Sequence, residues 1–361
     1  MKKLIYCALI AALFLSACSE DPTIDDPIII DDPIDTTENP VDTTEVPIVL
    51  DPYADWMKGL LLDYPEKDIA IRDISYPSAH DAGTYLFKFC TGGANACNTR
   101  TQDLNMTEML EAGVRGFDIR PVYANDKYFT QHVTECDGLG CRGDWISSIL
   151  EQTRAFLDHH SELMLFSFGH FCSTSAEDQG LLDLVYTILG DRLYRDSSEQ
   201  TTPFMDRPLE NIIPPSDSTG KAIIQFDGVS NTAANREKGI FSNSYLPVYG
   251  SYANSHNFNE MKADQLQKFN NYNPNGNQIF GLSWTMTLDA ELSIACAFTI
   301  FDPQGIEDFA NIANNNLASS MEEWRNDGTI VKGKIPNIIA LDFADKFVTD
   351  ECLKMTLFNI E

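Results

Sequence analysis

Apolar runs alternate with amphipathic stretches along residues 52–361, and this alternation constrains the fold more than any other feature. Near-continuous apolar runs are typical of parallel strands that are buried on both faces. The predicted strands are Ile69–Ser75, Gly116–Arg120, Tyr128–Gln131, Leu163–Phe168, Ala222–Phe226, Gln278–Thr285 and Asn337–Asp342. The predicted helices are Asp144–His159, Ser175–Leu189, Asn259–Phe269 and Glu307–Trp324.

This order predicts a single α/β barrel of the distorted TIM type, because about 310 residues of alternating strands and helices suit that fold. A doubly wound open sheet is the alternative. It is less favoured, since no Gly-rich phosphate fingerprint follows the first predicted strand. In a barrel, functional side chains are expected at the carboxyl ends of the strands.

The first 17 residues are typical of a secretory signal, with two lysines before the apolar stretch Leu4–Leu15. Leu15-Ser16-Ala17-Cys18 resembles the bacterial lipobox, which implies cleavage before Cys18 and lipidation of its thiol. Ser19-Glu20-Asp21 resembles an acidic export signal of lipoproteins in the Bacteroidetes. We therefore expect an exported lipoprotein anchored to the outer membrane, at the cell surface. An ordinary cleavable signal followed by a chance cysteine is the alternative.

Residues 18–51 are predicted to be a disordered acidic tether rich in Asp, Pro and Thr. Between Ser19 and Asp51 there are eleven acidic residues and no Lys or Arg, so the segment cannot bury enough surface to fold. The formal net charge of the chain is -29, and without the tether and the two signal lysines it is -20 on residues 52–361. Nucleic acid is excluded as a partner, because its binding needs clustered Lys and Arg.

Seven cysteines lie in residues 52–361. An exported protein keeps its disulfides, and the close spacings predict two local bridges, Cys90 with Cys97 and Cys136 with Cys141. The spacings match no zinc framework, so no metal is expected on these thiols. An odd number leaves one thiol free or buried.

Two histidines, an arginine and carboxylates follow predicted strands. His80 follows the first strand, His132 follows Tyr128–Gln131, Asp118 and Arg120 end the strand Gly116–Arg120, and Asp342 ends the last strand. One imidazole can remove a proton from a nucleophilic hydroxyl, the other can protonate a leaving oxygen, and a guanidinium can hold a phosphate. Each residue alone is commonly structural; their joint occurrence at strand ends predicts phosphoryl transfer.

These residues resemble the X domain of phosphatidylinositol-specific phospholipase C, especially its bacterial single-domain members. Ser78-Ala79-His80-Asp81-Ala82-Gly83-Thr84-Tyr85 is similar to the family's G-T-H-D-S-G-T-Y, and residues 113–120 are similar to its G-x-R-x-F-D-I-R. The spacing of twelve residues from Arg120 to His132 also matches. The resemblance is specific from about residue 69 to 170 and again near Asp342.

The resemblance implies that His80 is the general base that takes the proton of the inositol 2-hydroxyl, and that His132 is the general acid, assisted by Asp81. Asp342 would pair with His80, and Arg120 would bind the phosphate. The products would be diacylglycerol and inositol 1,2-cyclic phosphate. Arg120 stands where eukaryotic relatives place a calcium ligand, so we expect no calcium and no other cofactor.

The headgroup pocket departs from the family pattern, whereas the catalytic residues match it. Asp118, His170, Tyr252 and Trp284 are the predicted substrate-binding residues, with core or structural roles as the alternative for His170 and Trp284. Where bacterial members have a lysine and an arginine in the inositol pocket, this chain has Gly169 and Asp227. The expected partner is therefore phosphatidylinositol, or a glycosylated or modified inositol phospholipid, and we expect a monomer.

Two other functions stay open. Another barrel phosphodiesterase, acting on glycerophosphodiesters, would normally have an H-R-G start and paired carboxylate metal ligands, whereas His80 is followed by Asp81-Ala82. A non-catalytic surface lipoprotein could bind an inositol or glycan headgroup. The presence of the full histidine, arginine and carboxylate set argues against it.

Overall fold

The computed structural model describes residues 50–136, 138–196, 202–298 and 303–361. The predicted signal segment 1–17, the predicted lipidation site Cys18 and all but the end of the tether lie outside these residues. Residues Val49–Glu361 form one unit, which begins close to the predicted start of the barrel. None of the helices in the described ranges is long and apolar enough to cross a bilayer.

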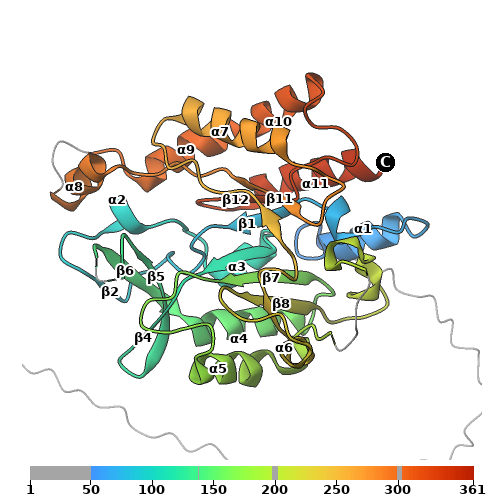
Figure 1. Ribbon diagram of the computed structural model, residues 1–361, viewed down its shortest axis with the longest axis horizontal. Coiled ribbons are helices and arrows are strands. Elements are labelled where there is room, and N and C mark those ends of the chain that lie inside the picture. The colour runs from blue at the N-terminus through green and yellow to red at the C-terminus, as the bar shows by residue number, and fades with distance from the viewer. Residues whose placement is uncertain (1–49, 137, 197–201, 299–302) are drawn as a thin grey trace, which may run out of the picture. The chain divides into compact units, whose positions relative to one another are not determined.

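An eight-stranded parallel sheet forms the centre of this unit (Figure 1). In order across the sheet, the strands are β10 (Val248–Tyr249), β11 (Ile279–Ser283), β12 (Ile338–Leu341), β1 (Tyr76–Ala79), β3 (Gly116–Ile119), β7 (Leu163–Phe168), β8 (Lys221–Phe226) and β9 (Ile240–Ser242). The sheet is curled, but no ladder in the described residues joins β9 to β10. The predicted fold class, a distorted TIM-type barrel, is confirmed, with an open seam between these two strands.

Most of the predicted barrel strands are observed. Gly116–Arg120, Leu163–Phe168, Ala222–Phe226, Gln278–Thr285 and Asn337–Asp342 coincide with β3, β7, β8, β11 and β12 to within two residues. The prediction of a strand at Ile69–Ser75 was wrong. Those residues contain a 3-10 turn at Ile71–Asp73, and their isoleucines pack into a core cluster together with the first residues of several strands.

Helices surround the sheet, and most of them cover its outer face (Figure 1). They are α1 (Trp56–Asp63), α2 (Ala96–Thr99), α3 (Met106–Glu111), α4 (Ile146–Leu157), α5 (Gln179–Leu189), α6 (Ala233–Lys238), α7 (Phe258–Asn271), α8 (Ala290–Phe298), α9 (Ile306–Asn315), α10 (Leu317–Asn326) and α11 (Lys346–Ile360). The predicted helices at 144–159, 175–189 and 259–269 are confirmed as α4, α5 and α7. The predicted helix at 307–324 is two helices, α9 and α10, which meet at Asn316.

Strand β7 shows why the apolar runs form this architecture. Successive side chains of a strand point to opposite faces, so a strand buried on both faces must be apolar at nearly every position. Met164, Phe166 and Phe168 pack in the cluster that contains the buried residues of α4 and α5. Leu163 and Leu165 belong to the cluster on the other side.

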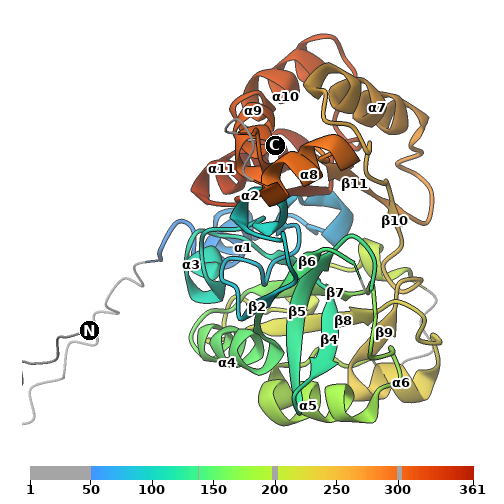
Figure 2. The same ribbon diagram turned by 90° about the vertical axis from the view of Figure 1, so that its left-hand side faces the viewer.

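A second sheet takes three strands from the segment between β3 and β7 and one from the segment between β1 and β3. Its four antiparallel strands follow the order β2 (Phe89–Cys90), β6 (Gly140–Trp145), β5 (Lys127–Val133) and β4 (Pro121–Ala124). Figure 2 shows these strands in front of β7 and β8. The predicted strand Tyr128–Gln131 belongs to β5, and so its assignment to the barrel was wrong.

Three disulfides are formed, and neither predicted pair is among them. The observed pairs are Cys90–Cys141, Cys97–Cys296 and Cys136–Cys172. Cys90 lies opposite Cys141 in the ladder between β2 and β6, so the sheet register brings together cysteines that are far apart in sequence. Cys352 is free and buried, in agreement with the odd number of cysteines.

Candidate active site

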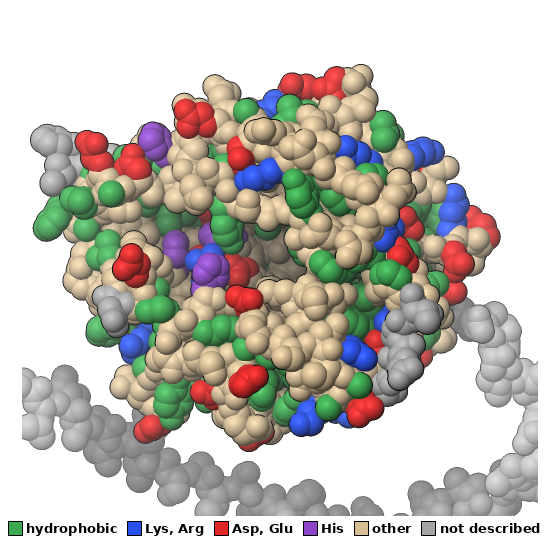
Figure 3. Space-filling model, viewed as in Figure 1, with side chains coloured by type: hydrophobic (Ala, Val, Ile, Leu, Met, Phe, Trp, Pro, Cys, Tyr) green, Lys and Arg blue, Asp and Glu red, His purple; other side chains and the backbone are tan. Residues whose placement is uncertain are grey.

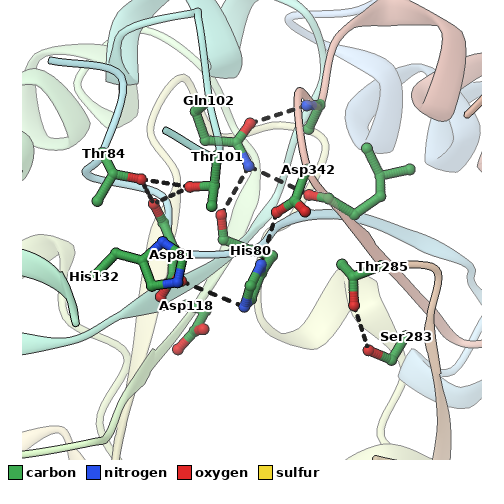
Figure 4. A network of polar contacts seen from close by, with 12 residues as sticks. His80, Asp81, Thr84, Thr101, Gln102, Asp118, His132, Ser283, Thr285 and Asp342 are labelled. Atoms are coloured by element: carbon green, nitrogen blue, oxygen red, sulfur yellow. Dashed lines mark hydrogen bonds and ion pairs between the residues drawn. The ribbon is translucent and has the colours of Figure 1, made fainter. Parts of the chain in front are cut away.

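Polar side chains gather at the carboxyl ends of three adjacent strands (Figure 4). His80 follows β1, Asp118 and Arg120 lie at the end of β3, and Asp342 follows β12. Because β12, β1 and β3 are parallel neighbours, their ends meet at one edge of the sheet. The pairing continues beyond β1, since the N–H of Ala82 donates to the carbonyl of Asp118 at 2.9 Å.

His80 is held at both ring nitrogens. Its Nδ1 lies 2.7 Å from Oδ1 of Asp342, and its Nε2 lies 2.8 Å from Nη2 of Arg120. The carboxylate accepts only, so the Nδ1–H donates to Asp342 and the proton-free Nε2 faces the other site residues. Nε2 is the atom that can take a proton from a substrate.

The proton affinity of His80 is high. Burial alone would lower its pKa, but the carboxylates of Asp81 and Asp342 outweigh burial and raise the pKa of His80 to about 9. The contact with Arg120 requires a neutral ring, because two donors cannot share a 2.8 Å separation. The hydrogen-bond geometry therefore corresponds to the neutral ring. The neutral form is the one that acts as a general base, and with a pKa of about 9 it predominates only above that pH.

Arg120 joins the polar groups of the site. Its Nε contacts Oδ1 of Asp81, and its Nη2 donates to Asp118 at 3.2 Å and to the hydroxyl of Tyr252 at 3.3 Å. Burial would lower the pKa of Arg120, but the carboxylates of Asp81 and Asp118 raise it, so the guanidinium stays charged. Nη1 makes no hydrogen bond within the described residues. It can therefore donate to a phosphate oxygen.

Asp81 is buried in a backbone conformation that is uncommon for residues other than glycine, with φ 46°. The hydroxyls of Thr84 and Thr101 donate to its carbonyl at 2.9 Å and 3.2 Å. Burial disfavours its carboxylate, but the charges of His80 and Arg120 lower the pKa of Asp81 below its usual value. This turn directs one carboxylate toward the guanidinium and both histidines.

His132 faces Asp81 from the second sheet. It lies within β5, not after a barrel strand as predicted, and its Nε2 is 3.7 Å from Oδ2 of Asp81. Its Nδ1 lies 2.9 Å from the carbonyl of Thr99, which can only accept, so Nδ1 carries the proton. The rings of His80 and His132 are 6.4 Å apart between centroids, with Asp81 3.4 Å from Nε2 of His80. The two imidazoles thus stand on either side of one carboxylate.

Gly83 allows the sheet that carries His132 to approach β1. Its carbonyl accepts from the N–H of Asp144 at 2.9 Å and from the hydroxyl of Thr130 at 3.0 Å. A Cβ atom on Gly83 would overlap with the side chain of Thr130. The close contact between the two sheets at this glycine fixes the height of His132 above the barrel.

A buried amide links the strand ends, and sequence reasoning missed it. Gln102 Nε2 donates to the carbonyls of His80 at 2.8 Å and Leu341 at 3.2 Å, and its Oε1 accepts from the N–H of Ala344 at 2.9 Å. These bonds hold β1 next to β12, and so they hold His80 next to Asp342. No motif marks Gln102, because it lies in a loop whose partners are all distant in sequence.

A cavity of ≈ 470 Å³ lies beside these groups and extends into the barrel. Its lining includes the hydroxyls of Ser78, Ser167 and Ser283 on three strands, and it reaches Tyr76 and Ile338, the first residues of β1 and β12. TIM barrels usually fill this space with large branched side chains. Small polar side chains leave it hollow here, and Figure 3 shows a hollow beside the histidines.

Three predicted substrate-binding residues line this cavity: Asp118, His170 and Tyr252. The ring of Tyr252 lies 5.2 Å from that of His80, and burial together with the charge of Asp118 raises the pKa of its hydroxyl. Gly169 and Asp227 also line the cavity, whose described lining contains no Lys or Arg. The pocket therefore offers hydroxyl, amide and carboxylate partners, as a polyol requires.

Trp284 is not part of the pocket, and its prediction as a substrate-binding residue was wrong. It is fully buried, and its indole N–H donates to the carbonyl of Ala313 at 2.7 Å. Ser283 is the last residue of β11 and lines the cavity. The next side chain points to the opposite face, so Trp284 packs among the helices, edge-on to Trp324.

His80, Asp81 and Asp118 offer ligand atoms within 4.8 Å of one another, a spacing that could hold a metal ion. The guanidinium of Arg120 contacts all three residues. A fixed cation therefore lies among the same three groups.

No protein-family model matches the chain. Among curated proteins, the PI-PLC X domain-containing protein 3 of Danio rerio and that of Bos taurus are each 26% identical over 170 residues. The match covers 39% of this chain, and the chain spans about half the length of these relatives, 49% and 50%.

Solved structures resemble the chain over most of its length. Phosphatidylinositol-specific phospholipase C of Listeria monocytogenes has a TM-score of 0.60 and 18% identity, covering 86% of this chain and 99% of that protein. A variant of the Staphylococcus aureus enzyme has a TM-score of 0.56 and 14% identity, covering 85% and 97%. These likenesses show the fold. Together with the curated matches and the motifs around His80 and Arg120, they support a PI-PLC X-domain-like family for the chain.

Proposed function

We propose that this protein is a phosphodiesterase of the phospholipase C type, which cleaves an inositol phospholipid to diacylglycerol and inositol 1,2-cyclic phosphate. One observation carries the proposal. His80 and His132 face each other across Asp81, with Arg120 beside them, next to the cavity in the barrel. A base, an acid and a phosphate-binding cation are what an in-line attack on a phosphodiester needs.

In the proposed reaction, Nε2 of His80 takes the proton of the inositol 2-hydroxyl. That oxygen forms a bond to phosphorus, and the bond from phosphorus to the glycerol oxygen breaks. His132, protonated on both ring nitrogens beside Asp81, gives its Nε2 proton to the leaving oxygen and keeps the Nδ1 proton that it donates to the carbonyl of Thr99. Arg120 holds the phosphate and neutralises the charge that develops on it, while Asp342 orients His80 and balances the imidazolium as it forms.

The substrate hydroxyl must take the place of Arg120 at Nε2 of His80. That contact is 2.8 Å long in the ligand-free site. A phosphate that binds the guanidinium would draw it away from the ring, and this frees Nε2 at the moment when the base is needed. Binding of the phosphate and activation of the base would therefore be coupled through one side chain.

The reaction is proposed to need no calcium, because Arg120 supplies the cation between Asp81 and Asp118. Activity should persist in excess chelator. Loss of activity in chelator with recovery on addition of calcium would contradict this part of the proposal.

We further propose that the protein is an exported lipoprotein anchored through Cys18. The lipobox-like residues 15–18 and the acidic segment after them support this. Metabolic labelling with palmitate should mark the protein in the membrane fraction, and Cys18→Ala should abolish the label. Labelling that survives the substitution would contradict it.

Release of cyclic inositol phosphate from phosphatidylinositol vesicles tests the proposed function. His80→Ala and His132→Ala should each lower the rate by about 10² to 10⁴, the range of general acid and base catalysis. His159→Ala is a matched control, because His159 is exposed and lies beyond the end of α4. Equal release by all four proteins would contradict the mechanism. No release by the wild type would contradict phosphatidylinositol as the substrate.

A further inference from the structure

The two catalytic histidines are supported in different ways. His80 continues β1, pairs with Asp342, and has its carbonyl bound by Gln102. His132 has one hydrogen bond within the described residues besides those of its strand, from Nδ1 to the carbonyl of Thr99. The direction in which Nε2 of His132 points therefore depends on where the Thr99 carbonyl lies.

Thr99 is the last residue of α2, a helix of four residues. Isolated helices shorter than about 12 residues are marginal in water, so α2 needs support from its neighbours. Asn95 Nδ2 donates to the carbonyl of Cys296 at 2.9 Å, and Asn98 Nδ2 donates to the carbonyl of Ser293 at 3.3 Å. Both acceptors belong to α8, which lies beside α2 in Figures 1 and 2.

Helix α8 is itself weakly anchored by packing. Cys296 is its one buried residue in the described part of the helix, and Ile294 is 56% exposed. The disulfide between Cys296 and Cys97 of α2 joins two elements that could not hold each other firmly by apolar contacts. The chain of connections runs from Cys296 through Cys97 and Thr99 to His132.

We propose that the Cys97–Cys296 disulfide is a positioning element for His132, acting through the carbonyl of Thr99. The disulfide touches no reacting group. It fixes α2, α2 fixes the carbonyl, and the carbonyl fixes the tautomer and orientation of the general acid. This inference rests on the proposed function for its kinetic consequences, but the position of the His132 ring can be measured without any activity.

The kinetic test is a double-mutant cycle on phosphatidylinositol vesicles. Cys97→Ala/Cys296→Ala should lower kcat by about 10²-fold, the scale of a misplaced catalytic group, while KM stays near the wild-type value. In a His132→Ala background, the same pair of substitutions should change the residual rate by no more than about twofold. Additive losses would show that the disulfide supports the whole fold rather than His132, and would overturn the proposal.

Cys136→Ala/Cys172→Ala is the matched control, since it removes a disulfide from the loops that follow β5 and β7 without touching α2 or α8. Cys172 Sγ lies 3.9 Å from the carbonyl of His170 at the cavity, so this variant can change KM, but it should leave kcat within about twofold of the wild type because the Thr99 carbonyl keeps its support. An equal loss in the control would also overturn the proposal.

The structural test observes the Nδ1–H proton of His132 by NMR in histidine-labelled protein. This proton should be protected from exchange in the wild type and in the Cys136→Ala/Cys172→Ala control, and should lose protection in Cys97→Ala/Cys296→Ala. If that variant does not fold, the same signal is followed in wild-type protein whose disulfides are opened stepwise by a phosphine, with the opened pair identified by mass spectrometry. Protection that survives the loss of Cys97–Cys296 would overturn the proposal, even in a protein that cleaves no phospholipid.

Discussion

Two buried arginines stand at opposite ends of β3. Arg115 precedes the strand, at the amino end of the sheet, and Arg120 follows it, at the carboxyl end. Both contact carboxylates, Arg115 with Glu162 at 2.8 Å and Arg120 with Asp81 and Asp118. Arg115 is fully buried and the Arg120 side chain is 12% exposed, so residue type alone does not tell them apart and burial differs only a little.

The hydrogen bonds of the two arginines distinguish them. Arg115 donates from Nε to Glu162, from Nη1 to the carbonyls of Leu110 and Val114, and from Nη2 to those of Tyr53 and Ala54, at 2.8 to 3.0 Å. All its donors are used, mostly by backbone groups. It ties the segment before α1 and the end of α3 to the base of the barrel.

Arg120 donates to side chains instead, and most of these can titrate or move. Its partners are His80, Asp81, Asp118 and Tyr252, and its Nη1 has no hydrogen bond within the described residues. The comparison suggests a rule for buried arginines. An arginine whose N–H groups donate mostly to backbone carbonyls stabilises the fold. An arginine whose N–H groups donate to titratable side chains, with one left unbonded, indicates a catalytic site.

Arg120→Lys tests this comparison most directly. An ammonium keeps the charge but loses the planar fork, so the rate on phosphatidylinositol should fall by about 10³-fold, the upper range for removal of one preorganised donor. The free energy of unfolding should change little, because backbone groups do not depend on Arg120. Activity assays and urea unfolding measure the two effects. A stable variant with near wild-type activity would show that Arg120 only balances charge.

Arg115→Met should show the opposite pattern. It removes the counter-charge of the buried Glu162, which keeps only the N–H groups of Met57 and Lys58 as donors, and it takes a donor from four backbone carbonyls. Breaking a buried ion pair from one side costs about 3–5 kcal/mol. Urea unfolding should record this loss, whereas kcat per folded molecule should stay near the wild-type value. A loss of kcat in fully folded protein would remove the distinction between the two arginines.

Asp342→Asn tests the charge beside the base. The general base works in its neutral form, so with the pKa of His80 raised to about 9 the rate should rise with pH up to that region. An amide keeps an acceptor for Nδ1 but removes one of the two carboxylates that raise this pKa. The acid limb of the pH–rate profile should therefore move to lower pH, and the plateau rate should fall by about tenfold per unit of lost pKa at most. An unmoved limb would mean that another group controls the profile.

Much of the fold could be predicted because the burial of a strand or helix is reflected in the pattern of apolar residues along it. Strand β7 is apolar at all but one position, since it is covered on both faces, and its predicted and observed bounds agree. The first strand was misplaced because Pro77, which has no N–H to donate, made Tyr76–Ala79 a poor strand candidate. The isoleucines just before it alternate like a strand, but they fill the base of the barrel.

The second sheet could have been found from its turn. Asn125 and Asp126 both have positive φ, as the tight turn of a hairpin between β4 and β5 requires. The disulfides could not have been found, because they follow the register of that sheet and the contact of α2 with α8. Short sequence spacing suggested local pairs, whereas tertiary contacts set the real ones.

The residues of the site can also be divided into those that the sequence predicted and those that it did not. His80, Asp81 and Arg120 belong to the two sequence motifs, whereas His132 was found from its spacing to Arg120 and Asp342 from the end of an apolar strand. The structure brings all five together. Gln102 and the Thr99 carbonyl carry no signal in the sequence. Their roles depend on which loops meet, and such contacts are properties of the fold.

The smallest effect is expected for Tyr252→Phe, which tests how much one hydrogen bond of Arg120 contributes. Tyr252 accepts from Nη2 at 3.3 Å, the longest of the bonds that this nitrogen makes, and Nη2 keeps His80 and Asp118 as partners without it. Tyr252→Phe keeps the ring beside His80 and removes only the hydroxyl. A neutral hydrogen bond contributes about 1 kcal/mol net, so kcat should fall by about fivefold or less. A loss as large as that of Arg120→Lys would mean that the phenol contacts the reacting atoms directly. Arg120 would then be only one member of the phosphate site, and the hydroxyl of Tyr252 would be the second.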